Sequence, residues 1–262
     1  MKLFFFFLLP LVFCLDISAI HVNNPAYPSY FQQGLFYKVK KKPAWGIKTS
    51  VFYDNIYKGR YEDEFKTINS NPANIEMSTI GAALYFNMRN RLDVVGYVGY
   101  SQMRLDKLYY THRCPSYGGG GSLLLLKTHN IYLTIDAKYF RTDQKSDYFL
   151  CDGQVAPIIG DFELQYEEIQ GALTLGYEIE FLIPYIGMTY LYSSIDPSPP
   201  TGILQIPGTE YLVDFHTSRA VTRRNWGMLV GCSLVDNEMM SLTLESRFFD
   251  QNAYHVSGTF RF

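Results

Sequence analysis

The chain lacks any long apolar run beyond its first residues. After Leu3 to Leu15, no segment of the 262 residues approaches the roughly 20 apolar residues that a membrane-spanning helix needs. The mean hydropathy is close to zero, at -0.07. A protein that crosses a membrane with several apolar helices is therefore excluded.

A surplus of charge of one sign is also missing. The 23 Lys and Arg side chains nearly balance the 25 Asp and Glu side chains, and the formal net charge is -2. This balance gives no basic surface for nucleic acid.

Motifs for catalysis are equally sparse. No serine lies in a G-x-S-x-G turn. Gly118 to Gly121 lack the lysine and the helix of a phosphate-binding loop, and they predict a flexible loop or a bulge. A protease that activates water could use an Asp-x-His pair such as Asp214-Phe215-His216. It would also need facing acidic side chains, and the only candidate cluster in a nearby predicted loop is Glu62, Asp63 and Glu64. We therefore expect no enzyme activity, no metal site and no cofactor.

The first residues have the features of an export signal. Met1 and Lys2 give a positive start, an apolar stretch follows, and Ile17, Ser18 and Ala19 come after it. This pattern predicts a signal peptide over residues 1–19, cleaved near Ala19. A lipid-modified Cys14 is the less favoured alternative, because the bulky Phe13 precedes it. An exported chain without a second anchor is either secreted or a closed barrel, since only helices and closed barrels satisfy the backbone in lipid.

An alternation of apolar and polar residues favours the barrel. In residues 253–262, one face carries Tyr254, Val256, Gly258, Phe260 and Phe262. The same period of two recurs at 80–88, 92–101, 131–139, 169–181, 186–192, 226–234 and 240–248. One such strand would also fit a soluble sandwich, but repeated strands of about ten residues are typical of a membrane barrel. The 22 Tyr and 19 Phe suit aromatic girdles at two interfaces.

The connections alternate in length, as those of bacterial barrels do. Short breaks at 89–90, 127–128, near 182 and at 236–237 alternate with long ones at 55–74, 105–118, 142–167 and 194–221. With further strands near 45–54 and 119–126, the sequence predicts an all-β transmembrane antiparallel up-and-down β-barrel of ten strands over 45–262. Residues 20–44 are expected to form a periplasmic or lumen segment. Twelve strands is the alternative if the stretches near Leu35 or Phe162 also cross.

The polar face of the strands predicts which side chains line the interior. The candidates are Asp93, Asp136, Lys138, Glu178, Glu180, Arg223, Glu245, Arg247, His255 and Arg261. Mixed charges either pair and close a narrow barrel or set ion selectivity in a wider one, and ten strands lies between these cases. Glu178 and Glu180, near an inner pore mouth, predict a mild cation preference.

Three of the four cysteines lie in the predicted barrel. Cys114 and Cys151 fall in outer loops at the two ends of one hairpin, and they are expected either to form a disulfide or to remain free or intermolecular thiols. Cys232 shares the face of Trp226, Met228 and Val230, so we expect it to face lipid as a small apolar residue.

Short motifs at both ends resemble a known family. They are Asn24 to Ser29 (NPAYPS), Gly34 to Phe36 (GLF) and Val51 to Asp54 (VFYD), then Thr243 to Arg247 (TLESR), Asp250, His255-Val256 and Phe260 to Phe262 (FRF). In this order they resemble the chlamydial major outer membrane protein family. The resemblance implies a porin in the outer membrane of a Gram-negative bacterium, with a structural role in a disulfide-cross-linked envelope. This chain is much shorter than the major porin and is poor in cysteine, which argues against a wide pore and against cross-linking.

The expected function is passive diffusion of small polar solutes or ions, together with a structural role in the envelope. The alternative is a non-conducting structural or adhesive barrel that acts through its extracellular loops. The expected partners are outer-membrane lipid, small solutes or ions, a second copy of the chain in a homo-oligomer, and the barrel assembly machinery. That machinery would recognise the final strand through Tyr254, Val256, Phe260 and Phe262.

Overall fold

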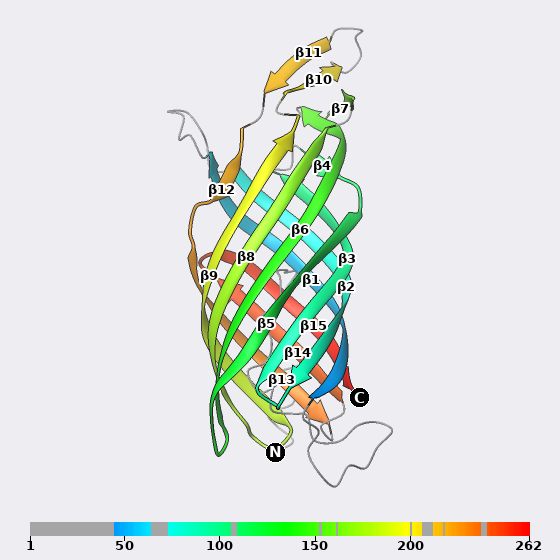
Figure 1. Cartoon of the computed structure of the whole chain (residues 1–262). Coiled ribbons are helices and arrows are strands. Elements are labelled where there is room, and N and C mark those ends of the chain that lie inside the picture. Colours follow the sequence, from blue (N-terminus) through cyan, green and yellow to red (C-terminus); the bar gives the residue numbers. More distant parts are fainter. Residues whose placement is uncertain are drawn as a thin grey trace, which may run out of the picture.

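Ten strands of the computed structural model form a closed antiparallel ring (Figure 1). The structure describes residues 45–63, 73–105, 109–151, 154–160, 162–199, 201–205, 212–216, 218–236 and 240–262. The ring runs through β1 (Trp45–Asp63), β2 (Ala73–Met88), β3 (Leu92–Leu105), β5 (Cys114–Thr128), β6 (Ile131–Cys151), β8 (Glu163–Tyr177), β9 (Leu182–Ser198), β13 (Trp226–Asp236), β14 (Met240–Phe248) and β15 (Gln251–Arg261). The predicted barrel of ten strands is confirmed. In the described part of the chain, no helix is long and apolar enough to span a membrane.

The first and last strands close the barrel. β1 pairs with β15 from Lys48 opposite Arg261 to Gly59 opposite Gln251, with one register shift between Ile56 and Lys58. This seam leaves neither strand with an unpaired edge along that length. Phe162 precedes β8 and adds no further crossing. Leu35 and the predicted signal peptide over 1–19 lie outside the described residues.

The turns at one end are short, and the connections at the other end are long except for the tight turn between β14 and β15, as expected. The short ones include Arg89 to Arg91 and His129–Asn130, and in both the backbone reaches positive φ. At the long end the strands continue into the predicted loops, so that β1 extends to Asp63 and β6 to Cys151. Continued pairing satisfies the backbone there more fully than irregular loops would.

Five short strands extend the wall at the long-loop end. They are β4 (Tyr109–Thr111), β7 (Gln154–Ile159), β10 (Thr201–Gln205), β11 (Leu212–His216) and β12 (Ala220–Thr222). β7, β10 and β11 pair in that order and project beyond the barrel (Figure 1). β12 pairs with both β1 and β9, above the place where the β14–β15 hairpin ends.

Apolar side chains cover the outside of the barrel. Val98 and Trp226 are each 65% exposed, whereas their neighbours Tyr97 and Gly227 are buried. Exposed aromatic residues lie toward both ends: Trp45, Phe86, Tyr177, Phe181, Phe260 and Phe262 toward the short turns, and Tyr100, Tyr139, Tyr190, Trp226 and Phe249 toward the long connections. An apolar band between two aromatic girdles is the pattern of a barrel surface in lipid.

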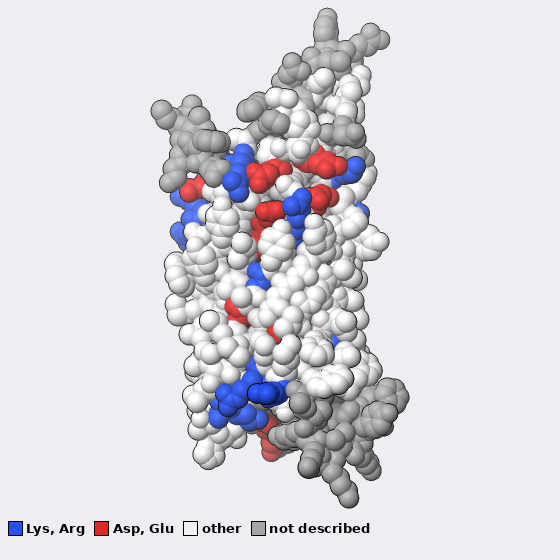
Figure 2. Space-filling view, viewed as in Figure 1, with Lys and Arg blue, Asp and Glu red and all other residues white. Residues whose placement is uncertain are grey.

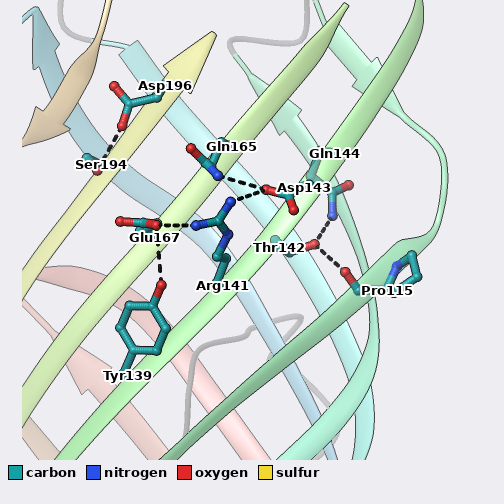
Figure 3. A network of polar contacts seen from close by, with 10 residues as sticks. All are labelled: Pro115, Tyr139, Arg141, Thr142, Asp143, Gln144, Gln165, Glu167, Ser194 and Asp196. Atoms are coloured by element: carbon teal, nitrogen blue, oxygen red, sulfur yellow. Dashed lines mark hydrogen bonds and ion pairs between the residues drawn. The ribbon is translucent and has the colours of Figure 1, made fainter. Parts of the chain in front are cut away.

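Charged side chains gather near the two ends of the barrel, with a mostly uncharged zone between them (Figure 2). Near the long-loop end, Arg141 lies 2.9 Å from Glu167 and 3.4 Å from Asp143, and Gln165 donates to Asp143 (Figure 3). Lys145 lies 3.0 Å from Glu163. These partly exposed ion pairs mark the wall beyond the apolar band.

Cysteine labelling tests this orientation. Val230 is exposed on the apolar band and Leu244 is half-buried on the same face, whereas Ser198 is exposed near the long-loop end. In a variant without the native cysteines, we expect V230C and L244C in cells to react slowly with a water-soluble maleimide and S198C to react rapidly, because lipid shields the first two. Equal rates at the three positions would contradict the barrel orientation.

Candidate functional site

The barrel interior brings together seven of the ten predicted interior residues. The buried ones are Asp93, Asp136, Lys138, Glu245, Arg247, His255 and Arg261, carried by β3, β6, β14 and β15. Each lies at the inward parity of its strand, where every second side chain points into the barrel.

The other three predicted interior residues lie elsewhere. Arg223 follows β12 and is exposed near the long-loop end. β8 ends at Tyr177, before the predicted strand end at Phe181, because Ile179 and Leu182 bridge a tight turn. Glu180 is therefore exposed in that turn, at a φ of 54°. Glu178 is half-buried and accepts a hydrogen bond from the hydroxyl of Tyr132. Glu180 therefore lies in a turn and not on the inward face of a strand, where the sequence analysis placed it, and the cation preference stays a prediction.

A buried ion pair joins two strands in the part of the interior near the short turns. Lys48 Nζ lies 2.5 Å from Asp93 Oδ2, and both side chains are 0% exposed. Asn87 Nδ2 donates to the other carboxylate oxygen of Asp93 over 2.6 Å. Sequence reasoning missed Lys48, although it shares the inward parity of Ser50 and Asp54 on β1. The contact joins β1 to β3 across β2.

Further polar contacts fill the middle of the interior. Asp54 Oδ1 lies 2.7 Å from His255 Nδ1 across the β1–β15 seam. The hydroxyl of Tyr185 donates to Glu245 over 2.9 Å. Arg247 is 1% exposed beside these groups. The interior thus carries both signs of charge in close proximity, as expected for a narrow barrel.

Aromatic rings cross the interior closer to the long-loop end. Phe52 meets Tyr97 edge to face at 6.2 Å between centroids, Tyr97 stacks on Phe140 at 6.3 Å, and Phe140 meets Tyr166 at 6.1 Å. The Tyr166 hydroxyl lies 3.4 Å from that of Tyr61, which returns the chain of contacts to β1. We call these five residues the aromatic layer. It belongs to a buried cluster that also includes Ile56, Ile75, Met77, Val95, Met103 and Ile195.

Little space remains beside the aromatic layer. A cavity of about 20 Å³ lies between Phe52, Asp54, Ala83, Tyr85, Val95, Tyr97, Lys138 and Phe140. That volume holds about one water molecule. In the described part of the chain, the side chains around this cavity fill the interior there.

The glycine run Gly118 to Gly121 makes room for the aromatic layer. It lies within β5 and is not a loop, which corrects the sequence prediction. A Cβ atom on Gly118 would lie 2.5 Å from the ring of Tyr97. The Tyr97 hydroxyl passes this point to donate to the carbonyl of Tyr139. Small residues on β5 therefore let a large side chain from β3 reach β6.

The strand register does not support a disulfide, one of the two alternatives for Cys114 and Cys151. Cys114 is buried and free, and its Sγ accepts a hydrogen bond from the backbone N–H of Lys145 over 3.4 Å. Ser116 pairs with Thr142, whereas Cys151 pairs with Gln154 at the far end of β6. At about 3.3 Å per residue, this register keeps the two cysteines much farther apart than the Cα separation of up to about 7 Å that a disulfide allows. Cys232 is free and half-buried on the outward parity of β13.

The tripeptide Asp214-Phe215-His216 lies in β11, in the sheet that projects beyond the barrel. Glu62 pairs with Val221 in the barrel wall. In the described residues, no group of three His, Cys, Asp or Glu side chains is arranged to hold a metal ion.

Comparison with known proteins adds the family context. The model described as Chlamydia major outer membrane protein matches residues 204–262. The family resemblance is confirmed. The major outer membrane porin of Chlamydia pneumoniae is 30% identical over 127 residues, covering 38% of this chain and 33% of the relative. The serovar E porin of Chlamydia trachomatis is 27% identical over 131 residues, covering 39% and 33%. The match spans about 33% of the length of these relatives.

Solved outer-membrane barrels are similar at low identity. The outer membrane protease OmpT of Escherichia coli has a TM-score of 0.45 and 9% identity, covering 83% of this chain and 97% of that chain. The translocator domain of NalP from Neisseria meningitidis has a TM-score of 0.45 and 11% identity, covering 83% and 88%. The similarity to outer-membrane porins, together with the apolar band, supports an outer-membrane location for this chain.

Proposed function

We propose that this porin-like outer-membrane barrel is closed at rest and serves the envelope as a non-conducting structural or surface barrel. The observation that carries the proposal is the aromatic layer, which links β1, β3, β6 and β8 through the interior. Ten strands enclose less space than the sixteen or more of open porins, so large side chains can fill the section.

The long-loop end supplies the surface for a structural role. β7, β10 and β11 form a small sheet beyond the barrel, and the ion pairs of Arg141 and Lys145 line the wall below it. Residues that bind partners are commonly held on such projections from a rigid scaffold.

Passive diffusion is the second candidate. The interior carries Lys48, Asp93 and Arg261 near the short turns and Glu245 in its middle, and the matched relatives are named porins. In this function, the aromatic layer would have to move before a solute could pass.

Solute uptake, measured by vesicle swelling, separates the two candidates. We expect vesicles that contain the folded protein to swell in small sugars no faster than protein-free vesicles, because the aromatic layer occupies the path. An open porin reconstituted at equal density provides the positive control. Swelling at a rate near that of the control would refute the closed barrel and favour diffusion.

A further inference from the structure

The barrel wall has a step near its long-loop end. The β14–β15 hairpin ends at Phe248 to Gln251, whereas β1 continues to Asp63. Above the hairpin, β12 fills the wall, with Thr222 opposite Tyr61 and Ala220 opposite Ile195. Figure 1 shows β12 beside β1, beyond the ends of β14 and β15.

Four basic side chains surround this step: Lys58, Arg60, Arg223 and Arg224, which we call the basic step. Arg223 donates its backbone N–H to the carbonyl of Arg60 over 3.0 Å, so the two segments are in contact. Lys58 lies opposite Asn252 beside the hairpin. Lys58, Arg223 and Arg224 are exposed, and Arg60 is half-buried.

The basic step differs from several other basic side chains at this end of the barrel. Elsewhere, Arg104, Arg141, Lys145 and Arg219 each lie within 4.0 Å of a carboxylate. Within the described ranges, none of the basic-step side chains makes such an ion pair. Glu62 is the acidic neighbour on the same face of β1, and Asp196 is already engaged by Arg219 at 3.0 Å. Among the side chains that the structure describes, the step therefore keeps a local excess of positive charge.

Two large apolar side chains lie close to the basic step in the chain and in the strand pairing. Phe249, at the tip of the hairpin, is 58% exposed, and Trp226 follows Arg224 closely in the chain and is 65% exposed. Exposed aromatics of this kind lie at the level of lipid head groups. Cations placed just beyond such aromatics meet the phosphates of anionic lipids, and arginine forms paired hydrogen bonds with phosphate.

We propose that the basic step binds the phosphates of an anionic lipid in the outer leaflet, with Phe249 and Trp226 against its acyl chains. The four cations match a head group with more than one phosphate, such as that of a phosphorylated glycolipid. The proposal needs only the outer-membrane location and is independent of whether the barrel conducts.

Titration with diphosphoryl lipid A tests the assignment. In a W45F background, Trp226 is the only tryptophan and reports binding to the folded full chain in zwitterionic micelles. We expect R223Q/R224Q to raise the apparent Kd roughly 25-fold, since each of the two charges near an anionic lipid contributes about a factor of five. The matched control R104Q/R141Q removes two arginines that have acidic partners, and we expect a change of about twofold or less.

Further measurements identify the ligand. Binding to the unaltered chain is expected to weaken as salt approaches about 1 M. Inorganic phosphate at equal concentration is expected to leave Trp226 unchanged, because it has no acyl chains. K58Q/R60Q removes the other two charges of the basic step and is expected to weaken binding as well. Every variant is checked for the heat-modifiable mobility of a folded barrel. Equal affinity in both arginine pairs, or equally tight binding of phosphatidylcholine, would overturn the proposal, as would saturation by inorganic phosphate alone.

Discussion

The Asp93→Ala variant is expected to lose about 3–5 kcal/mol of unfolding free energy, the usual cost of removing one partner of a buried ion pair. The carboxylate lies 2.5 Å from Lys48 Nζ, where both side chains are 0% exposed. Arg261 lies opposite Lys48 on β15, so the variant would leave two buried cations on adjacent strands with less compensation. Urea unfolding in lipid vesicles, followed by tryptophan fluorescence, measures the loss.

Two controls separate the buried pair from a general effect of losing a carboxylate. Asp143→Ala removes a partner of Arg141 that is 43% exposed, and we expect a cost below about 1 kcal/mol. The double variant K48M/D93L replaces both charges by apolar groups and is expected to regain most of the stability. If D93A and D143A were equally stable, the interior pair would not hold β1 to β3 as described.

Much of the fold could be predicted from the sequence because a barrel repeats one rule. Period-two alternation places lipid-facing and interior side chains at once, so Val98 and Asp93 fell on their correct faces without any knowledge of tertiary contacts. The strand ends were less accurate. β1 and β6 run beyond the apolar band, and there neither alternation nor composition distinguishes a paired strand from a polar loop.

The closed interior could not be predicted in the same way. In the sequence, nothing distinguishes Tyr97 and Phe140 from other inward residues. Only the strand order brings their ring centroids to 6.3 Å from each other. The role of Gly118 likewise follows only from the Tyr97 ring that packs beside it, since a glycine run alone is typical of a loop. Parity assigns a residue to the interior, but it does not show which residue lies opposite.

A variant that empties the aromatic layer is expected to turn a closed barrel into a conducting one. Y97A/F140A removes two adjacent rings from the path between β3 and β6, and the neighbouring Gly118 and Ala83 are too small to refill the space. The matched control Y100A/Y139A removes two rings from the outer face of the same strands, where Tyr100 is 58% and Tyr139 is 37% exposed. Equal amounts of heat-modifiable folded protein confirm that all forms are compared as barrels.

Single-channel current in a planar bilayer tests the central claim most directly. The closed barrel predicts no steady current from the unaltered chain or from Y100A/Y139A at moderate voltage, and discrete current steps from Y97A/F140A. The steps would arise because ions pass the charged interior once the rings are gone. Steady open-channel current from the unaltered chain, unchanged in Y97A/F140A, would contradict the aromatic layer as the barrier.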